Sequence, residues 1–237
     1  MRTVKALKNM ITSVIQQIVS FICGLIVPRL ILGTFGSDVN GLVNSITQFL
    51  SYISLLESGF GAVVKSILYK PIARKNKQEI EDILRASEHF FRIIAIIFVG
   101  YIIVLCFIYP LFVNNQFDTM FTVSLILIIA ISTFAEYFFG MTYKLYLQAE
   151  QKAYVTSSIQ IITTILNTIL VVILIKFGAN IQIVKLVSAL VFVLRPVLQN
   201  VYVKRKYKIN LKNSQKEFKI EQKWDGFAQH LARSYTW

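Results

Sequence analysis

Acidic and basic side chains occur inside long apolar stretches of this 237-residue sequence. The acids are Glu57 and Glu136, and the bases are Arg29, Lys185 and Arg195. An unpaired charge costs at least about 2.5 kcal/mol at the centre of a membrane-spanning helix, so such groups usually pair or face water. An ion pair is favoured for either acid taken alone, and the bases could instead extend to a membrane rim. For the five groups together, a hydrated cavity is the better interpretation.

Small and polar residues recur at spacings of three and four in four of these stretches, which places each set on one helical face. One explanation is close helix packing, because small residues let backbones approach and hydroxyls bond across. The other is a water-filled cavity, which we favour because the stripes accompany the charges. The residues predicted to line it are Asn44, Thr47, Ser51, Ser54, Ser58, Gln160, Thr163 and Asn167.

Motifs for covalent chemistry are missing from the sequence. It contains no D-x-D pair of a sugar-nucleotide transferase, no G-x-x-x-x-G-K-[ST] phosphate loop and no H-E-x-x-H zinc motif. The two histidines, His89 and His230, cannot build a metal site between them. We therefore expect no enzymatic activity, no metal and no cofactor, which leaves the movement of a solute or lipid.

The composition indicates which elements hold these groups. Hydrophobic residues make up 55% of the chain and charged residues only 16%, whereas a soluble domain carries about 25% charged residues. The apolar stretches are long enough to cross about 30 Å of hydrocarbon. This excludes a soluble enzyme, a secreted disulfide scaffold and an ordinary nucleic-acid binder, and predicts an all-α integral membrane protein with six transmembrane helices. The predicted spans, within a lobe of residues 1–203, are about 11–32, 39–64, 90–113, 119–141, 154–176 and 180–203.

The distribution of positive charge predicts the orientation. Of 25 Lys and Arg residues, 19 lie in four segments that alternate with three loops containing none. The positive-inside rule then places both termini, and the segments 66–89 and 142–153, in the cytoplasm. Segment 66–89 is predicted either as an amphipathic helix on the membrane surface or as a connector whose apolar face packs under the bundle. The basic residues suit anionic lipid headgroups as partners, and we expect no nucleic acid.

Two sequence motifs resemble a known family. The first is Pro28-Arg29-Leu30-Ile31-Leu32-Gly33-Thr34-Phe35-Gly36, followed by Gly41-Leu42. The second is Leu55-Leu56-Glu57-Ser58-Gly59-Phe60-Gly61, followed by the basic loop Lys70–Lys77. Both are similar to motifs of bacterial polysaccharide-export flippases in the multidrug/oligosaccharidyl-lipid/polysaccharide superfamily. That family usually shows Leu-Leu-Asp-x-Gly-x-Gly at the second motif, so Glu57 replaces an Asp and keeps the charge.

The resemblance implies an N-terminal lobe of six helices, which a second lobe would face across a cavity exposed alternately to each side of the membrane. The implied function is to flip an undecaprenyl-pyrophosphate-linked oligosaccharide across the bacterial cytoplasmic (inner) membrane for O-antigen, capsule or exopolysaccharide. Cavities in such flippases are cationic, which makes Arg29, Lys185 and Arg195 the candidate substrate-binding residues. Glu57 and Glu136 are then the candidate cavity acids.

The last segment, 204–237, is predicted to be a basic cytoplasmic tail that leads into a truncated seventh span. We therefore expect a fragment that lacks the C-terminal lobe, with polysaccharide assembly proteins as further partners. Two alternatives stay open. One is a cation-coupled multidrug exporter of the same superfamily, and the other is a non-transporting structural membrane subunit of polysaccharide assembly.

Overall fold

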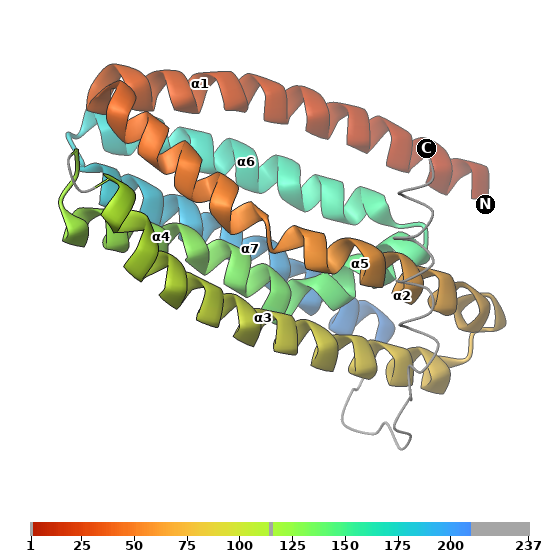
Figure 1. Ribbon diagram of the computed structural model, residues 1–237. Helices are drawn as coiled ribbons and strands as arrows, with labels where there is room; N and C mark the ends of the chain where they lie inside the picture. Colours follow the sequence, from red (N-terminus) through yellow and green to blue (C-terminus); the bar gives the residue numbers. More distant parts are fainter. Residues whose placement is uncertain (1, 114–115, 210–237) are drawn as a thin grey trace, which may run out of the picture.

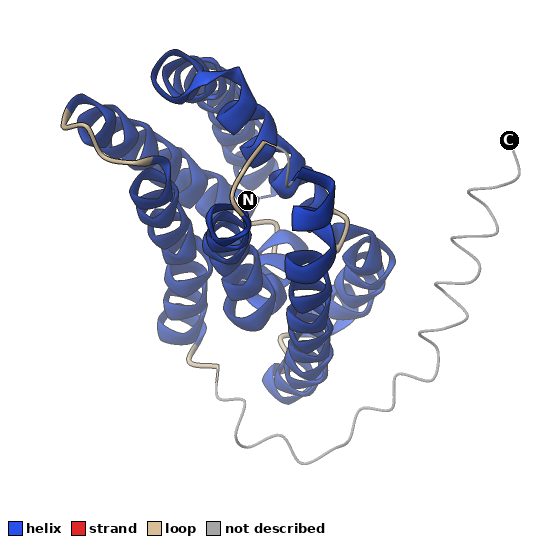
Figure 2. Cartoon of the chain, turned by 60° about the vertical axis from the view of Figure 1, so that its left-hand side comes forward, coloured by secondary structure: helices blue, strands red, loops and turns tan. Residues whose placement is uncertain are grey.

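The computed structural model describes residues 2–113 and 116–209, and within these ranges every regular element is a helix (Figures 1 and 2). The predicted seventh span falls at 210–237, outside the described residues. The elements in chain order are α1 (Arg2–Ser51), α2 (Ser54–Arg74), α3 (Lys77–Val113), α4 (Thr119–Ala135), the π-helix η1 (Glu136–Gly140), α5 (Met141–Ala149), α6 (Ala153–Lys176) and α7 (Ile181–Tyr207).

Five helical segments of the described chain are long and apolar enough to cross a membrane. They are Thr3–Ser51, Lys77–Val113, Thr119–Ala149, Ala153–Lys176 and Ile181–Tyr207. Large apolar side chains such as Phe107, Leu111 and Phe112 are more than 70% exposed on the outside of the bundle. Such a surface is unfavourable in water and suited to lipid. The described part of the chain is therefore all-helical and belongs to the multi-pass membrane class.

A turn at Gly36 divides α1 into two arms, residues 2–35 and 37–51. Gly36 has φ +87° and ψ 172°, a backbone conformation that a residue without a Cβ adopts easily. Figure 1 shows the chain doubling back at this end of the molecule. The second arm then continues through a break at Tyr52 and Ile53 into α2. The predicted second span, 39–64, thus corresponds to this arm together with the first half of α2.

The core lies between the second arm of α1 and the helices that follow it, with Leu42, Ile46 and Leu50 of that arm buried. Phe91 and Phe98 of α3 are fully buried, as are Leu125 and Ile126 of α4. The first arm of α1 lies at the edge of the bundle beside α6 (Figure 1). Most of its apolar residues are exposed, from Val4 to Leu25.

In segment 66–89 the apolar face packs into the bundle, as in the second of the two predicted alternatives, and does not form a separate surface helix. Helix α2 continues to Arg74 and α3 begins at Lys77, so no separate helix lies on the surface. Ile83, Leu84 and Ser87 of α3 are buried in the bundle. Segment 142–153 is also more helical than predicted, because α5 continues to Ala149.

The connections gather at the two ends of the bundle. The N-terminus, the α2–α3 turn and the α5–α6 turn lie at one end, and the turn at Gly36 and the α6–α7 turn lie at the other (Figure 1). The first end carries the lysine-rich segments, and we call it the basic end. The lysine-rich segments and the loops without Lys or Arg therefore lie at opposite ends of the bundle, as the charge distribution predicts.

Candidate functional site

Arg195 joins α7 to α6 through two threonine hydroxyls. Its Nε donates a hydrogen bond of 2.8 Å to Thr163 Oγ1, and its Nη2 donates one of 2.8 Å to Thr164 Oγ1. The guanidinium carbon also lies 4.2 Å from the centre of the Phe192 ring, a cation–π distance. A guanidinium has five N–H donors, so donors remain for an anion beyond the two that the threonines use.

Glu136 and Lys144 form an ion pair across the π-helix. Lys144 Nζ lies 2.7 Å from Glu136 Oε1, and the side chains are 24% and 44% exposed, respectively. In an ideal α-helix, residues eight apart point about 80° away from each other. A one-residue π-bulge moves the pair towards the in-phase i,i+7 relationship. The local break in helical register thus brings the two charges together.

Glu57 of α2 faces the same region from the other side. Its Oε2 accepts a hydrogen bond of 3.1 Å from the hydroxyl of Tyr137, the residue after Glu136. Of the charged residues around it, Lys144 has the largest electrostatic effect on this carboxylate, and Glu136 acts on it with the opposite sign. Arg195 in turn exerts an electrostatic repulsion on the ammonium group of Lys144.

We call Glu57, Glu136, Lys144 and Arg195 the charged cluster. The four side chains come from α2, η1, α5 and α7, and two acids balance two bases. Charges at this depth are tolerated when they are paired and hydrogen-bonded. An anion that enters such a cluster can compete with the acids for Lys144 and Arg195, so the arrangement suits reversible binding of an anion and offers no nucleophile–base pair.

The predicted stripe of the second stretch lies on an open face. Asn44, Thr47, Ser51 and Ser54 are exposed. The buried positions beside them are Val43, Ile46 and Leu50 of α1, and Ile53 in the break before α2. The hydroxyls of Thr47 and Ser51 bond only carbonyls of their own helix, those of Val43 and Gln48. Within the described part of the chain, these four residues therefore form no packed seam, and we call them the open stripe.

The predicted stripe of the fifth stretch, on α6, lies at helix contacts. Thr163 is 1% exposed and Asn167 7% exposed, while Gln160 is half-buried. Asn167 Oδ1 has no hydrogen-bond partner among the described residues. This stripe has the character of a packed interface, in which Thr163 positions Arg195. The side chain of Ser58, the remaining member of the predicted set, lies outside the described residues.

The other two predicted cations do not join the cluster. Arg29 is exposed on the first arm of α1. Lys185 is half-buried on α7, ten residues or about 15 Å along the helix from Arg195. The structure therefore separates the three predicted cations instead of gathering them into one site.

Three contributors to the cluster were not among the predicted site residues: Tyr137, Lys144 and Thr164. Lys144 appears in the sequence as one of the basic residues that follow an apolar stretch. Its alignment with Glu136 depends on the π-helix, for which the sequence offers no spacing signal. Thr164 is adjacent to the predicted Thr163, and a stripe drawn at spacings of three and four omits it.

Comparison with protein families, curated proteins and solved structures found no match for this chain.

Proposed function

We propose that the chain forms one lobe of a flippase that moves undecaprenyl-pyrophosphate-linked oligosaccharide across a bacterial cytoplasmic membrane for surface polysaccharide. The observation that carries this proposal is the open stripe. Asn44, Thr47 and Ser51 are exposed on a helix whose neighbouring positions are buried. The hydroxyls of Thr47 and Ser51 bond within their own helix, but a row of polar side chains still suits water, a polar substrate or a second lobe better than lipid.

The proposed topology has six crossings. Segment Thr3–Ser51 has 49 residues and would extend about 75 Å as one straight helix. A hydrocarbon layer is only about 30 Å thick. The turn at Gly36 lets this segment supply the first span and, with the start of α2, the second. With the basic end in the cytoplasm, both termini of the proposed lobe are cytoplasmic.

The charged cluster supplies the proposed chemistry for a pyrophosphate. Arg195 has N–H donors beyond those that bond Thr163 and Thr164, and a guanidinium matches the geometry of phosphate oxygens. Lys144 adds a second positive charge when Glu136 releases it. Glu57 and Glu136 then act as counter-ions, because their carboxylates interact with the two cations again when the substrate leaves. This competition keeps the affinity of the cluster for the substrate moderate, so that the substrate can be released after transport.

Alternation in this proposal needs a second wall opposite the open stripe. Repeat-built transporters obtain it from a second lobe that rocks against the first around a midplane site. The resemblance of the motifs around Arg29 and Glu57 to polysaccharide-export flippases supports the choice of substrate.

The test is deletion of the gene in the source organism. The expected result is loss of surface polysaccharide together with accumulation of its lipid-linked oligosaccharide on the cytoplasmic leaflet. The wild-type gene should restore both, and Arg195→Gln should restore them poorly. Arg205→Gln, at an exposed position near the end of the same helix, is the matched control and should complement fully. Normal polysaccharide with new drug sensitivity would contradict the proposal in favour of an exporter, and no change in either would contradict transport altogether.

A further inference from the structure

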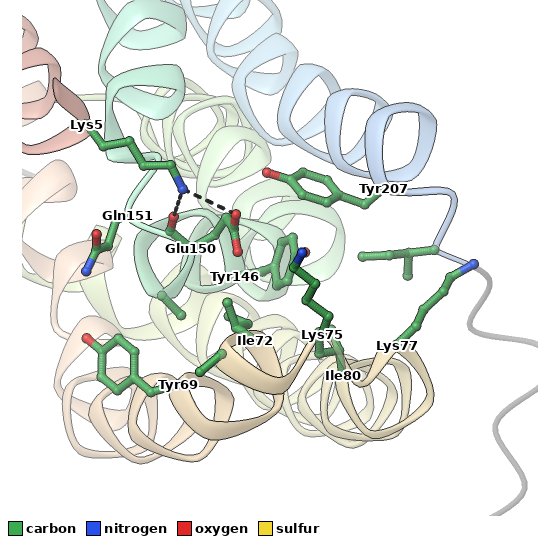
Figure 3. Close-up of a pocket in the computed structure, with 13 residues that line it drawn as sticks. Lys5, Tyr69, Ile72, Lys75, Lys77, Ile80, Tyr146, Glu150, Gln151 and Tyr207 are labelled. Atoms are coloured by element: carbon green, nitrogen blue, oxygen red, sulfur yellow. Dashed lines mark hydrogen bonds and ion pairs between the residues drawn. The ribbon is translucent and has the colours of Figure 1, made fainter. Parts of the chain in front are cut away.

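A cavity opens at the basic end, away from the charged cluster. It has a volume of about 700 Å³ and lies between the start of α1, the α2–α3 turn, the end of α5 and the end of α7 (Figure 3). Its polar lining comprises Lys5, Lys75, Lys77, Tyr69, Tyr146 and Tyr207, along with Glu150 and Gln151. Ligand pockets typically have this size and combine an apolar wall with a few polar groups.

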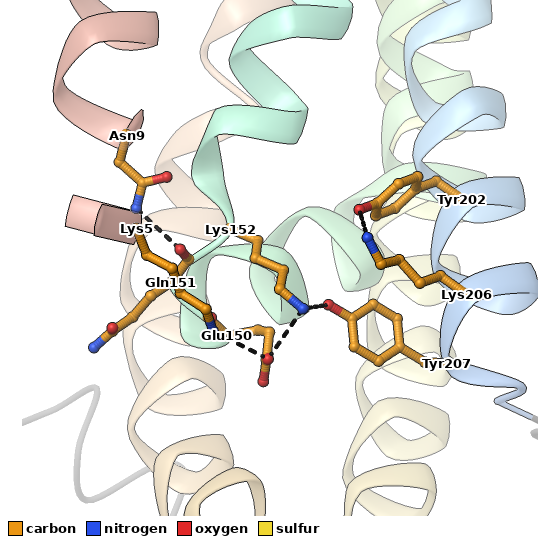
Figure 4. Close-up of polar contacts among 8 residues, drawn as sticks. All are labelled: Lys5, Asn9, Glu150, Gln151, Lys152, Tyr202, Lys206 and Tyr207. Carbon is orange, nitrogen blue, oxygen red and sulfur yellow. Dashed lines mark hydrogen bonds and ion pairs between the residues drawn. The ribbon is translucent and has the colours of Figure 1, made fainter. Parts of the chain in front are cut away.

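The one acid that lines the cavity, Glu150, is neutralised by two lysines. Lys5 Nζ lies 3.5 Å and Lys152 Nζ 3.3 Å from Glu150 Oε1 (Figure 4). Asn9 fixes the same turn, because its side chain donates to the Gln151 carbonyl and accepts from the backbone N–H of Tyr154. Glu150 therefore does not repel an anion, and this side of the cavity keeps one excess positive charge.

Lys75 and Lys77 add positive charge from the α2–α3 turn. Lys77 Nζ lies 3.6 Å from Glu81 Oε1, with the lysine side chain 57% exposed and the glutamate side chain 12% exposed. Among the described residues, no hydrogen bond or ion pair engages the ammonium group of Lys75. Its side chain points towards Tyr146 (Figure 3). The lining residues include three lysines and one glutamate, which leaves two net positive charges on the cavity wall.

The backbone holds Lys75 in this position. Its φ is 56°, and its N–H closes α2 by bonding the carbonyls of Ile72 and Pro71. Glycine or asparagine is the usual residue at such a left-handed helix end. The main chain of Lys75 thus completes the helix cap, while its charged side chain remains available to the cavity.

The aromatic residues offer hydroxyl donors next to these charges. Tyr207 Oη accepts a hydrogen bond from Lys152, so its own proton is free to be donated. Tyr146 packs edge-on against Tyr207, with ring centres 5.1 Å apart. The rest of the cavity is lined by Ile72, Ala73, Ile80, Ala149 and Ile209. A ligand with a phosphate head beside an apolar chain would match both kinds of lining.

We propose that this cavity is a binding site for a phosphate group, carried by a lipid headgroup or by a soluble phosphate compound, with Lys75 as its principal cation. Lysine binds phosphate as a compact point charge. Basic pockets between membrane helices at the cytoplasmic side commonly take anionic headgroups. This site is separate from the charged cluster, so a test of phosphate binding here is independent of the test of the transport proposal.

The experiment measures thermal unfolding of the full chain in maltoside detergent with increasing concentrations of three probes. The probes are inorganic pyrophosphate, phosphatidylglycerol and diacylglycerol, a lipid without phosphate. A ligand that binds the folded state raises the unfolding temperature. We expect pyrophosphate, phosphatidylglycerol or both to stabilise the wild type, and diacylglycerol to have no effect. Lys75→Gln should weaken the effective binding by about tenfold or more. Lys70→Gln, at an exposed position on the same helix, should not.

Stabilisation by phosphatidylglycerol alone would identify a lipid headgroup as the ligand, and stabilisation by pyrophosphate alone a soluble phosphate compound. A second measurement avoids substitution: acetylation of wild-type lysines, quantified by mass spectrometry, should slow at Lys75 but not at Lys70 when the active probe is present. The proposal is overturned if neither phosphate probe stabilises the wild type, or if Lys75 and Lys70 behave alike in both measurements.

Discussion

Gly140 of η1 packs against Pro196 of α7 with no space for a side chain between them. A Cβ atom placed on Gly140 would lie 2.3 Å from Pro196 Cβ and 2.8 Å from its Cα. Arg195 immediately precedes Pro196, and Glu136 begins the π-helix that Gly140 ends. The contact therefore sets how closely the cation of α7 approaches the acid of η1.

Gly140→Ala should lower the free energy of unfolding by about 1–3 kcal/mol, the usual cost of overpacking. Neither the proline ring nor its backbone can move away without shifting α7. The measurement is the unfolding temperature of the full chain in detergent. Gly100→Ala on α3 is the control, because an added Cβ there meets nothing within 4 Å. Alanine is up to about 1 kcal/mol better than glycine inside a helix, so the control should be neutral or slightly stabilised. Equal losses in both variants would contradict the close contact.

The pair Glu136–Lys144 should show a favourable coupling energy of about 1–2 kcal/mol in a double-mutant cycle. Fully buried pairs lose about 3–5 kcal/mol when one partner is removed, and partial exposure of Glu136 reduces this value. Lys144→Met alone leaves Glu136 without its counter-ion and should destabilise more than the double variant Glu136→Gln/Lys144→Met. Purely additive effects would show that the two charges do not depend on each other.

The sequence predicts the helical class and the general position of the elements well. Apolar runs of this length leave a membrane-crossing helix as the natural element, and the turn at Gly36 lies in the predicted loop between the first two stretches. Helix ends are less predictable. The apolar residues Ile83 and Leu84 could lie on a membrane surface or pack inside the bundle, and only tertiary contacts decide between the two.

The candidate site was only partly predictable for the same reason. A periodic pattern identifies one face of a helix, but not what covers that face. The open stripe and the α6 stripe share the same spacing, yet Ser51 is exposed and Thr163 is buried. The close packing of α7 against η1 depends on the contact between Gly140 and Pro196, two residues that lie more than 50 positions apart in the sequence.

The orientation of the bundle predicts a two-sided labelling pattern. Single cysteines at Ser37 and Phe177, in a background that lacks Cys23 and Cys106, should react with an impermeant maleimide added outside intact cells. A cysteine at Lys75 should react only after the cells are opened, because the basic end is predicted to face the cytoplasm. All three positions are exposed in the structure, so a difference in labelling reports the side of the membrane. Labelling of Lys75→Cys alone in intact cells would reverse the topology.

The open stripe predicts a difference in thiol reactivity between two exposed surfaces of the protein. Thr47 and Ser51 are exposed polar positions, while Ile97 and Val104 of α3 are each 52% exposed but belong to an apolar face. If the open stripe faces an aqueous path, cysteines at Thr47 and Ser51 ionise and react with a charged, water-soluble thiol reagent, because the thiolate is the reactive form. Cysteines at Ile97 and Val104, which lie against lipid, should react much more slowly. The assay uses membranes that contain the protein in its cellular form, again without Cys23 and Cys106. Fast reaction at all four positions would show that the α3 face is not in lipid. Equally slow reaction at all four would show that the open stripe is covered by a dry helix contact, and would remove the main support for the transport proposal.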